Sequence, residues 1–459
     1  MRHRLRAALA IAALPLLAAC PKSGQAAHAD LQSHDPLSRA DTDEASGHLD
    51  QAIDDCRQAL AMSPRRLDAW RRLVQLYAKG ARLPEITHEL LAKSKADPNN
   101  DALHYALGLA EFAETRTAGD QALVQFQQAE KLRPSEAEYP FRLGVAYFEL
   151  ERYQDAVGPL QRATQLAPDV AKYHVPLGLA LAKLGRKKAA MDAFKSLLHL
   201  QPTSKDVKLA QQALEQFEDP MRDIPQAESA NVKRGLDWLH QADQPQQAID
   251  TFEDVLDRYP DLAQVHTLVG LAYERLDNSG AAIEHLEKAI ELKPDDADPY
   301  LYLGELYYAK QKPEKAAGYF RQALARNPLL DRAYGRLGHI ALTRGDAATA
   351  LANFKPLVVL DPDSADAHKA LAQAYEASGK YEQAESELEN LVARDPKNPE
   401  AQLNLGYLYA GLAKQAKTPG EHDERSKQAL ASFQKVLDLQ PSNVAASRAI
   451  EQLRAQAPK

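Results

Sequence analysis

The amino-acid sequence predicts an all-α fold, an α-solenoid in which short helical units stack into a superhelix. The first observation is a period: prolines recur every 34 residues through most of the chain. The second is the alternation of small and large side chains at fixed places within each period, which is how paired helices interlock. A period of this length indicates units that bury their apolar faces against their neighbours. We expect about ten to eleven units, in one continuous superhelix or in two blocks.

The prolines that set the period form two series. Steps within each series are 34 residues, apart from a single step of 36 in the first. Proline cannot continue the hydrogen-bond ladder of a helix, so it marks the end of the second helix of each unit. The first series is Pro64, Pro98, Pro134, Pro168 and Pro202, and the second is Pro260, Pro294, Pro328, Pro362 and Pro396, followed by Pro441.

Side chains keep fixed roles within the period when the proline is counted as position 32. Position 8 is glycine in seven units, position 20 is alanine, and position 24 is phenylalanine or leucine. With this pattern, clearest in "YLYLGELYYAKQKPEKAAGYFRQALARNP", the chain resembles the tetratricopeptide repeat. The resemblance implies that every unit is a helix-turn-helix and that its first helix, helix A, lines the concave face of the superhelix.

Eleven units can be phased, from about residue 33 to residue 441. The first is the weakest, because its helix A, "PLSRADTDEASG", is nearly all polar, and we expect that helix to be frayed or half formed. An insertion in the last unit, "AKQAKTPGEHDERSK", should lengthen both of its helices or protrude as a loop. The residues from Ser442 onward, with Val444, Ile450 and Leu453, are expected to form a C-terminal capping helix.

A step of 58 residues separates Pro202 from Pro260 and indicates a division of the chain. The extra segment holds one apolar helical face, which is typical of a capping helix, and then two prolines typical of a linker. We predict a first block at 33–218, a linker at 219–227 and a second block at 228–459. A longer loop within one continuous superhelix is the alternative. The apolar face consists of Val207, Ala210, Leu214 and Phe217, and the linker prolines are Pro220 and Pro225.

The N-terminus has the three parts of a secretory signal. Three arginines precede an apolar run of thirteen residues, 7–19, which is shorter than the roughly 17 to 25 residues that span a bilayer. The run ends in Leu17-Ala18-Ala19-Cys20, which resembles the lipobox of bacterial lipoproteins. The resemblance implies a signal peptide at 1–19, acylation of Cys20 and a flexible tether at 20–32. An ordinary signal with a stray cysteine is the alternative.

Charge and cysteine content exclude several functions. The chain carries 56 basic and 64 acidic residues, and loss of 1–19 leaves 53 minus 64, a net charge of −11. Nucleic-acid binding is not expected, because such proteins show a basic footprint. Cys56 is the only other cysteine, so we expect no intrachain disulfide, and it falls in an apolar helical stripe as a core residue.

No catalytic or metal-binding motif is present in the sequence. It lacks HExxH, GxxxxGK[ST], GxSxG and CxxC, so we predict neither an enzyme nor a cofactor. Four of the fourteen histidines share repeat position 4, where the repeat packs a bulky side chain. Because they lie in separate units, a full repeat or more apart, they cannot converge on one ion, and we expect no metal. These are His104, His174, His266 and His368.

Helix A positions 2, 5, 9 and 12, here called the groove face, should point into the superhelix groove. In the third to fifth units these positions are apolar and mark a partner-binding site or hidden packing of one side chain on another. A partner would be an amphipathic helix or an extended apolar peptide. The predicted site is Tyr105, Leu109, Phe112, Phe141, Val145, Phe148, Val175 and Leu179; the second block has Lys233, Asp237, Thr267, Glu274, Glu305, His339, Lys369 and Gln373 instead.

Taken together, the sequence predicts a non-enzymatic protein-protein interaction scaffold. The lipobox resemblance implies anchorage through Cys20, and Pro21 is not the aspartate that retains lipoproteins at the inner membrane, so we expect the outer membrane, facing the periplasm. The partners would be other proteins of an envelope-spanning machine for motility, pilus assembly, secretion or polysaccharide export. The alternative is a carbohydrate-handling solenoid that guides an exopolysaccharide or recruits its modifying enzymes, with Tyr308 near Glu305, and Tyr407, as sugar-contacting aromatics.

Overall fold

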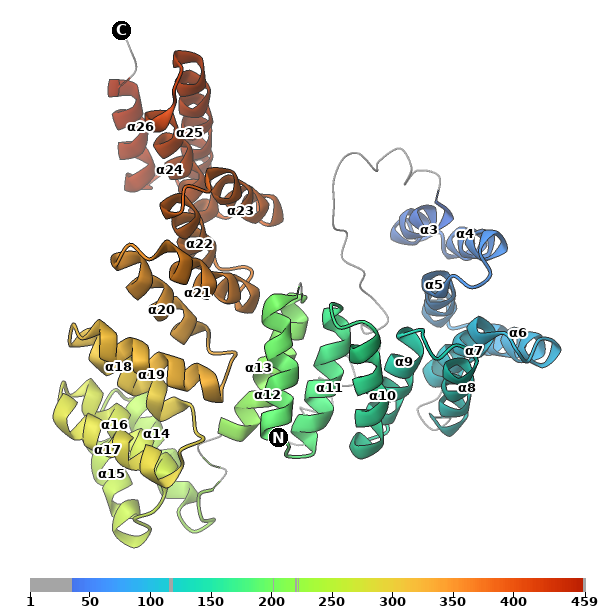
Figure 1. Ribbon diagram of the computed structural model, residues 1–459, viewed down its shortest axis with the longest axis horizontal. Helices are drawn as coiled ribbons and strands as arrows, with labels where there is room; N and C mark the ends of the chain where they lie inside the picture. The colour runs from blue at the N-terminus through green and yellow to red at the C-terminus, as the bar shows by residue number, and fades with distance from the viewer. Residues whose placement is uncertain (1–34, 115–118, 201, 219–220, 222, 457–459) are drawn as a thin grey trace. The chain divides into compact units, whose positions relative to one another are not determined.

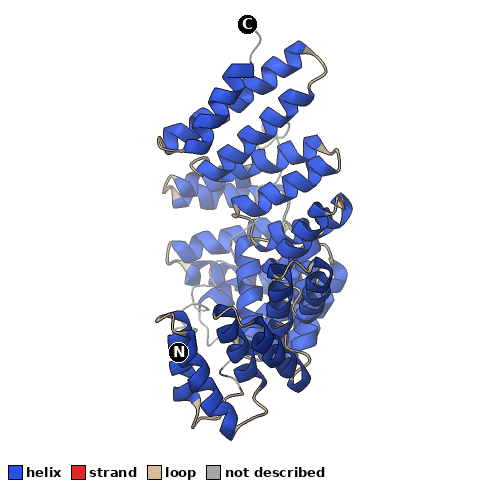
Figure 2. Ribbon diagram, turned by 90° about the vertical axis from the view of Figure 1, so that its left-hand side faces the viewer, coloured by secondary structure: helices blue, strands red, loops and turns tan. Residues whose placement is uncertain are grey.

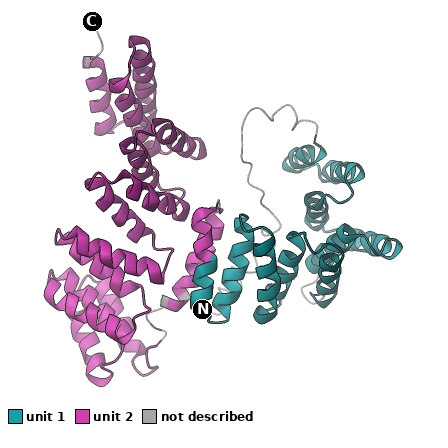
Figure 3. Ribbon diagram, in the orientation of Figure 1, with its two compact units in different colours: residues 1–193 teal, residues 194–459 magenta. Residues whose placement is uncertain are grey.

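A computed structural model describes residues 35–114, 119–200, 202–218, 221 and 223–456. In this part of the chain all regular structure is helical, with no strand (Figure 2). The helices form two compact units, residues 1–193 and 194–459, coloured separately in Figure 3. Eleven helix pairs and two single helices occur among the described residues, which confirms an all-α solenoid of ten to eleven units.

The first unit contains five successive helix pairs, labelled in Figure 1. Each helix packs against the helix that follows it in the chain for most of this series. The last helix, α12, crosses the division between the units. The pairs are α3 (Pro36–Ala45) with α4 (Leu49–Met62), α5 (Leu67–Lys79) with α6 (Leu83–Ala96), α7 (Asp101–Glu114) with α8 (Gly119–Leu132), α9 (Glu138–Glu149) with α10 (Tyr153–Leu166), and α11 (Ala171–Lys183) with α12 (Lys187–Lys195).

The second unit begins with a short 3₁₀ helix, η2 (Ser196–His199), and the single helix α13 (Ser204–Glu218). Six pairs and a last single helix follow. They are α14 (Ser229–His240) with α15 (Pro245–Arg258), α16 (Ala263–Arg275) with α17 (Ser279–Leu292), α18 (Asp298–Ala309) with α19 (Pro313–Arg326), α20 (Asp331–Thr343) with α21 (Ala347–Leu360), α22 (Ala365–Ala377) with α23 (Tyr381–Arg394), α24 (Pro399–Gln415) with α25 (Pro419–Leu439), and finally α26 (Val444–Gln456).

The predicted small and large positions make the contact between the two helices of each pair. At Gly304 an added Cβ would stand 2.6 Å from the ring of Phe320, so only glycine lets α18 approach α19 this closely. Every position-20 alanine has no exposed surface, and every position-24 side chain is at most 2% exposed. The alanines are Ala52, Ala122, Ala156, Ala190, Ala248, Ala282, Ala316, Ala350, Ala384 and Ala429.

Position 4 has a second role that concerns the end of the preceding unit. Its side chain donates a hydrogen bond to the carbonyl of the proline six residues earlier, as His266 Nε2 does to Pro260 O at 2.9 Å. Because carbonyl groups at the end of a helix have no partner within it, this bond ties the end of one helix B to the next helix A. The same bond is made by Trp70, His104, His174, Tyr300 and His368.

Most turns between the two helices of a pair carry a left-handed residue at position 15. Nine turns have a positive φ there, although only four of those residues are glycine. Ala81 and Gln311 adopt φ 56°, a conformation that costs roughly 1–2 kcal/mol for a residue with a side chain. The turn geometry is therefore set by the packing of the two helices, which overrides the local preference of these residues.

The first helix, α3, corrects one prediction. It is formed rather than frayed, with Ala40 fully buried against α4. Its polar residues pair with charges on neighbouring helices: Arg39 binds Asp55 at 2.7 Å and Arg72 binds Asp41 at 2.6 Å. Ion pairs between helices thus support a helix that has almost no apolar stripe of its own.

The predicted capping helices and the insertion are also visible. In α13 the predicted face is buried, with Val207 2% and Leu214 2% exposed. In α26 Ile450 is buried and Leu453 packs on the core, whereas Val444 is 60% exposed. The insertion lengthens α24 to 17 residues and α25 to 21, the first of the two predicted alternatives. The division between the units falls inside α12, ahead of the predicted linker, because η2 and α13 contact α21.

Candidate partner-binding surface

The eight predicted groove residues lie on three helices of the first unit, α7, α9 and α11. Six of them are buried, and only Phe112 and Leu179 are half-buried. The groove face of this unit is therefore not an open apolar stripe, which corrects the expectation that all eight side chains line a groove. The buried six are Tyr105 (0% exposed), Leu109 (4%), Phe141 (1%), Val145 (7%), Phe148 (9%) and Val175 (3%).

Contacts between aromatic rings explain this burial. The ring of Tyr105 lies 5.6 Å from that of Tyr139 on the next helix A. In the same way Phe141 lies 4.8 Å from Tyr173. Such tilted pairs contribute about 0.5–1.5 kcal/mol beyond the area they bury. The side chains thus pack on one another, which is the alternative that the sequence left open.

A buried carboxylate lies at the centre of this aromatic cluster. Glu138, 5% exposed, accepts hydrogen bonds from Arg142 Nε at 2.8 Å and from Lys172 Nζ at 2.7 Å. The hydroxyls of Tyr105 and Tyr173 donate to it at 3.3 and 3.2 Å, and Arg71 lies 3.8 Å away. We call these residues the Glu138 cluster.

Neighbouring cations stabilise the ionised form of Glu138. Burial by itself would raise the pKa of Glu138, but Arg142 and Lys172 outweigh burial and lower the pKa to about 2. Arg142 is as buried as the carboxylate, at 6% exposed, whereas the Lys172 side chain keeps 39% of its surface exposed. Lys172 therefore carries the accessible positive charge of the cluster.

The corresponding face of the second unit is built from charged groups. Glu305 is 9% exposed and binds Arg332 at 3.3 Å and Arg336 at 2.9 Å. The Arg336 guanidinium also lies 4.8 Å from the ring centre of Tyr308. Both members of the predicted sugar-contacting pair are thus already in contact with arginines. Tyr407 is 48% exposed and rests edge-on against Phe433.

A carboxylate on this face has the opposite character to Glu138. Glu274 is half-buried, and the pKa of its carboxyl is raised first by burial and then by the charge of Glu305. Thr267 is buried, while Lys233, Asp237, His339, Lys369 and Gln373 are exposed as their polarity predicts.

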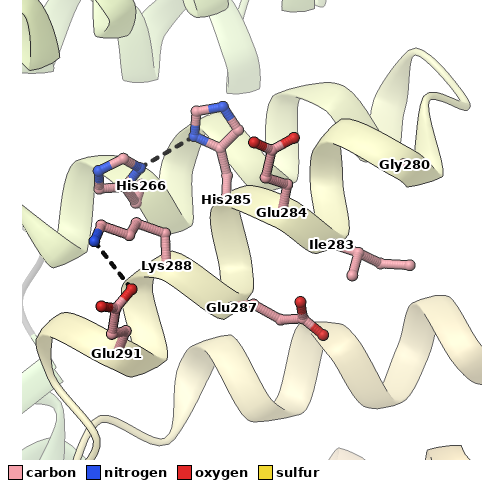
Figure 4. A pocket seen from close by; sticks show the side chains of 8 residues that line it. All are labelled: His266, Gly280, Ile283, Glu284, His285, Glu287, Lys288 and Glu291. Carbon is pink, nitrogen blue, oxygen red and sulfur yellow. Dashed lines mark hydrogen bonds and ion pairs between the residues drawn. The ribbon is translucent and has the colours of Figure 1, made fainter.

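Two cavities of the second unit flank two histidines, His266 on α16 and His285 on α17; Figure 4 shows the first of them. Their Nδ1 atoms are 3.1 Å apart. Burial, and next the neighbouring His266, lower the pKa of His285. One cavity, of about 460 Å³, is lined by Ile283, Glu284, Glu287, Lys288 and Glu291 beside the histidines; the other, of about 510 Å³, is lined by Asp250, Glu253, Asp254, Leu256 and Asp257.

The histidines predicted as packing residues keep separate sites in the structure. None of the four position-4 histidines meets another, but His266 meets a histidine of helix B, a partner that sequence reasoning missed. The spacing of 19 residues, position 4 to position 23, was the available signal, since His368 and Glu387 contact each other at 2.7 Å with the same spacing. Within the described ranges, no three His, Cys, Asp or Glu side chains are gathered around a point where an ion could sit.

Cys56 is fully buried in α4, and burial raises the pKa of its thiol to about 12. Such a thiol stays protonated at neutral pH and is a poor nucleophile. Cys20 and the predicted signal and tether, 1–19 and 20–32, lie outside the described residues. No helix in the described part of the chain combines the length and the apolar character needed to cross a bilayer.

Comparison with known families supports the assignment of tetratricopeptide repeats. Models described as tetratricopeptide repeat match residues 105–171, 160–205 and 301–365, residues 230–262, and residues 341–405, and one described as TPR repeat matches 280–311. No curated protein matches the chain in sequence.

Solved structures resemble it at low identity. YrrB, a TPR protein with an unusual peptide-binding site, is 21% identical over 44% of this chain and 97% of its own, with a TM-score of 0.36. MamA from Desulfovibrio magneticus RS-1 is 21% identical over 40% of this chain and 97% of its own, with a TM-score of 0.34. Yeast Tom70 is 15% identical over 93% of this chain and 96% of its own, with a TM-score of 0.34.

Fold and repeat pattern together define the class: the chain is an α-solenoid built from tetratricopeptide repeats. Solenoids of this kind present extended surfaces to other proteins, and the chain is a protein-protein interaction scaffold in that general sense. An architecture made of these repeats alone is typical of non-enzymatic proteins.

Proposed function

We propose that this protein is a lipid-anchored scaffold of the bacterial outer membrane, facing the periplasm, within an envelope-spanning machine for motility, pilus assembly, secretion or polysaccharide export. The observation that carries the proposal is the placement of Leu17-Ala18-Ala19-Cys20 at the end of a short apolar run, ahead of a solenoid made for protein contacts. Each buried methylene of an acyl chain adds about 0.8 kcal/mol, so two or three chains on Cys20 would hold the protein firmly at the membrane.

The groove face of the first unit is the partner surface that we favour. Phe112 and Leu179 keep part of their apolar surface exposed there, and Lys172 offers a cation from the Glu138 cluster. These features suit a partner segment with apolar side chains and an acidic group. Since the accessible apolar area is small, contacts here would be weak alone, and tethering at one membrane would raise the effective concentration of both proteins.

The anchor is tested by replacing Cys20 with serine. In wild-type cells we expect the protein in the outer-membrane fraction, with an acylated N-terminal peptide in the mass spectrum. Cys20→Ser should release it into the soluble periplasmic fraction at an unchanged thermal midpoint. An unmodified Cys20 in the wild-type protein would refute the anchor.

The partner surface is tested by photo-crosslinking in cells from an unnatural amino acid at position 112 or 179. The matched control is Val124 on α8 of the same repeat, an apolar residue that is 59% exposed but lies on helix B. We expect one discrete adduct with an envelope protein from positions 112 and 179, and its loss on Lys172→Glu. Equal adducts from position 124, or none from the groove positions, would count against this surface.

A further inference from the structure

We propose that His266 and His285 form a binding site for a divalent ion of the zinc, nickel and copper class. The inference is independent of the envelope role, because it rests on two side chains of the second unit and on the cavities beside them (Figure 4).

The hydrogen bond of His266 to the backbone prepares its ring for a metal. Its Nε2 lies 2.9 Å from Pro260 O, and because a carbonyl only accepts, this nitrogen must carry the proton. The neutral ring therefore turns the lone pair of Nδ1 toward His285. Metal-bound histidines commonly donate their second ring nitrogen to a carbonyl in this way, which fixes both tautomer and orientation.

The separation of the two nitrogens matches two positions of one coordination sphere. Zinc binds imidazole nitrogen at about 2.0–2.1 Å, so two such ligands at a tetrahedral angle stand roughly 3.3 Å apart. The two Nδ1 atoms are 3.1 Å apart, each on a different helix. Without a metal, His285 Nδ1–H donates to His266 Nδ1; with a metal bound, that proton would move to Nε2 of His285.

Carboxylates surround the pair and supply negative charge. Four line one adjoining cavity and three line the other, where Lys288 is the one cation among the lining residues and is bound to Glu291 at 2.9 Å. Glu253 is linked to the pair through Tyr273: it accepts a hydrogen bond from Tyr273 at 2.9 Å, and the Tyr273 ring packs on His285. Water would complete the sphere, since no third His, Cys, Asp or Glu side chain is gathered at this point among the described residues.

This donor set selects among metals. Imidazole suits zinc, copper and nickel, whereas magnesium and calcium prefer a sphere of oxygen atoms alone. The absence of a metal motif in the sequence is compatible with the site, because its two histidines come from the two helices of one repeat and stand 19 residues apart in the chain.

The test is titration of the purified full chain with zinc chloride, followed by calorimetry and by thermal unfolding. We expect saturable one-to-one binding and a rise of the thermal midpoint with zinc, and none with magnesium. Cobalt(II) in place of zinc should give the visible d–d absorption of a nitrogen-bound ion. His285→Ala and His266→Gln should each weaken zinc binding at least tenfold and remove the cobalt band.

The matched control is His368→Gln. His368 shares repeat position 4 and the bond to a proline carbonyl, at 2.9 Å from Pro362 O, but it faces Glu387 rather than a histidine. Its replacement should leave zinc affinity unchanged. Helical content by circular dichroism reports folding of each variant. Zinc binding that survives in both folded His266 and His285 variants, or that is equally lost in the His368 variant, would overturn the proposal.

Discussion

The groove faces of the two units show two ways to place a carboxylate within the same repeat. In the first unit Glu138 is sealed beneath aromatic rings together with Arg142, both nearly inaccessible to water. In the second unit Glu305 is equally buried, but Arg332 and Arg336 keep 55% and 41% of their side chains exposed. Fixed helix packing thus tolerates either a closed polar cluster or an open one, depending on the residues at a few helix A positions.

The difference between the two clusters determines which charged groups a binding partner can reach. A closed cluster has its hydrogen bonds satisfied internally, so it rigidifies the face and leaves only its edge, Lys172, to a partner. An open one exposes charge that solvent screens and that other ions can reach. The first face therefore offers little exposed charge, whereas the two arginines of the second face remain open to solvent.

The largest expected effect is on stability and would separate the two clusters. Glu138→Gln removes the charge that compensates a buried Arg142, and such a loss costs about 3–5 kcal/mol. Glu305→Gln should cost only about 1 kcal/mol, because its arginines can turn to water. Urea unfolding followed by circular dichroism measures both. Equal losses would abolish the distinction between closed and open clusters.

Lowering the pH should change the contributions of Glu138 and Glu274 to stability in opposite directions. The folded pKa of Glu138 is about 2, below the value of 4.5 for a free glutamate, so its stabilisation is complete above pH 4.5 and is lost as the pH falls toward 2. The pKa of Glu274 is raised instead, so its ionisation destabilises the fold as the pH rises above 4.5.

We therefore expect Glu138→Gln to remove about 3 kcal/mol of the stability lost between pH 4.5 and 2. Glu274→Gln should stabilise the protein at pH 7 and have little effect at pH 4. Unfolding free energies measured across this pH range provide the check. If the Glu138 variant loses as much stability between pH 4.5 and 2 as the wild type does, the prediction is wrong.

The contact between helix A and helix B should behave alike in both units. Gly108→Ala places a Cβ 2.8 Å from Phe126, and Gly304→Ala places one 2.6 Å from Phe320. Each should cost about 1–3 kcal/mol through overpacking. Gly318→Ala, in the same repeat but with no atom within 4 Å, should stabilise by about 0.5–1 kcal/mol. Thermal unfolding distinguishes the three, and a large difference between the first two would extend the contrast beyond the groove face.

The smallest expected effect concerns the turns. Ala81→Gly in the first unit and Gln311→Gly in the second relieve the same φ of 56°. Each should gain up to about 1 kcal/mol, with no change in helical content. A gain in one unit alone, seen as a shifted unfolding midpoint, would show that the two units hold their turns differently.

Much of the fold was predictable because it repeats. Position 20 and position 24 recur in nearly every unit, so the identity of the buried alanines and of the large side chains followed from counting. The groove face was harder. Helical phase placed Tyr105 and Phe141 correctly on one side of helix A, but it could not show that each would be covered by a tyrosine of the following repeat.

By itself, the sequence determined the solenoid, its repeat number, the glycine contacts and the buried apolar face of α13, because these depend on local periodicity. Only the tertiary structure decided that α3 folds on ion pairs, that the aromatic stripe closes over Glu138, and that His266 meets His285. These outcomes depend on which side chains of separate helices reach one another, a matter of distances and burial that a linear pattern does not contain.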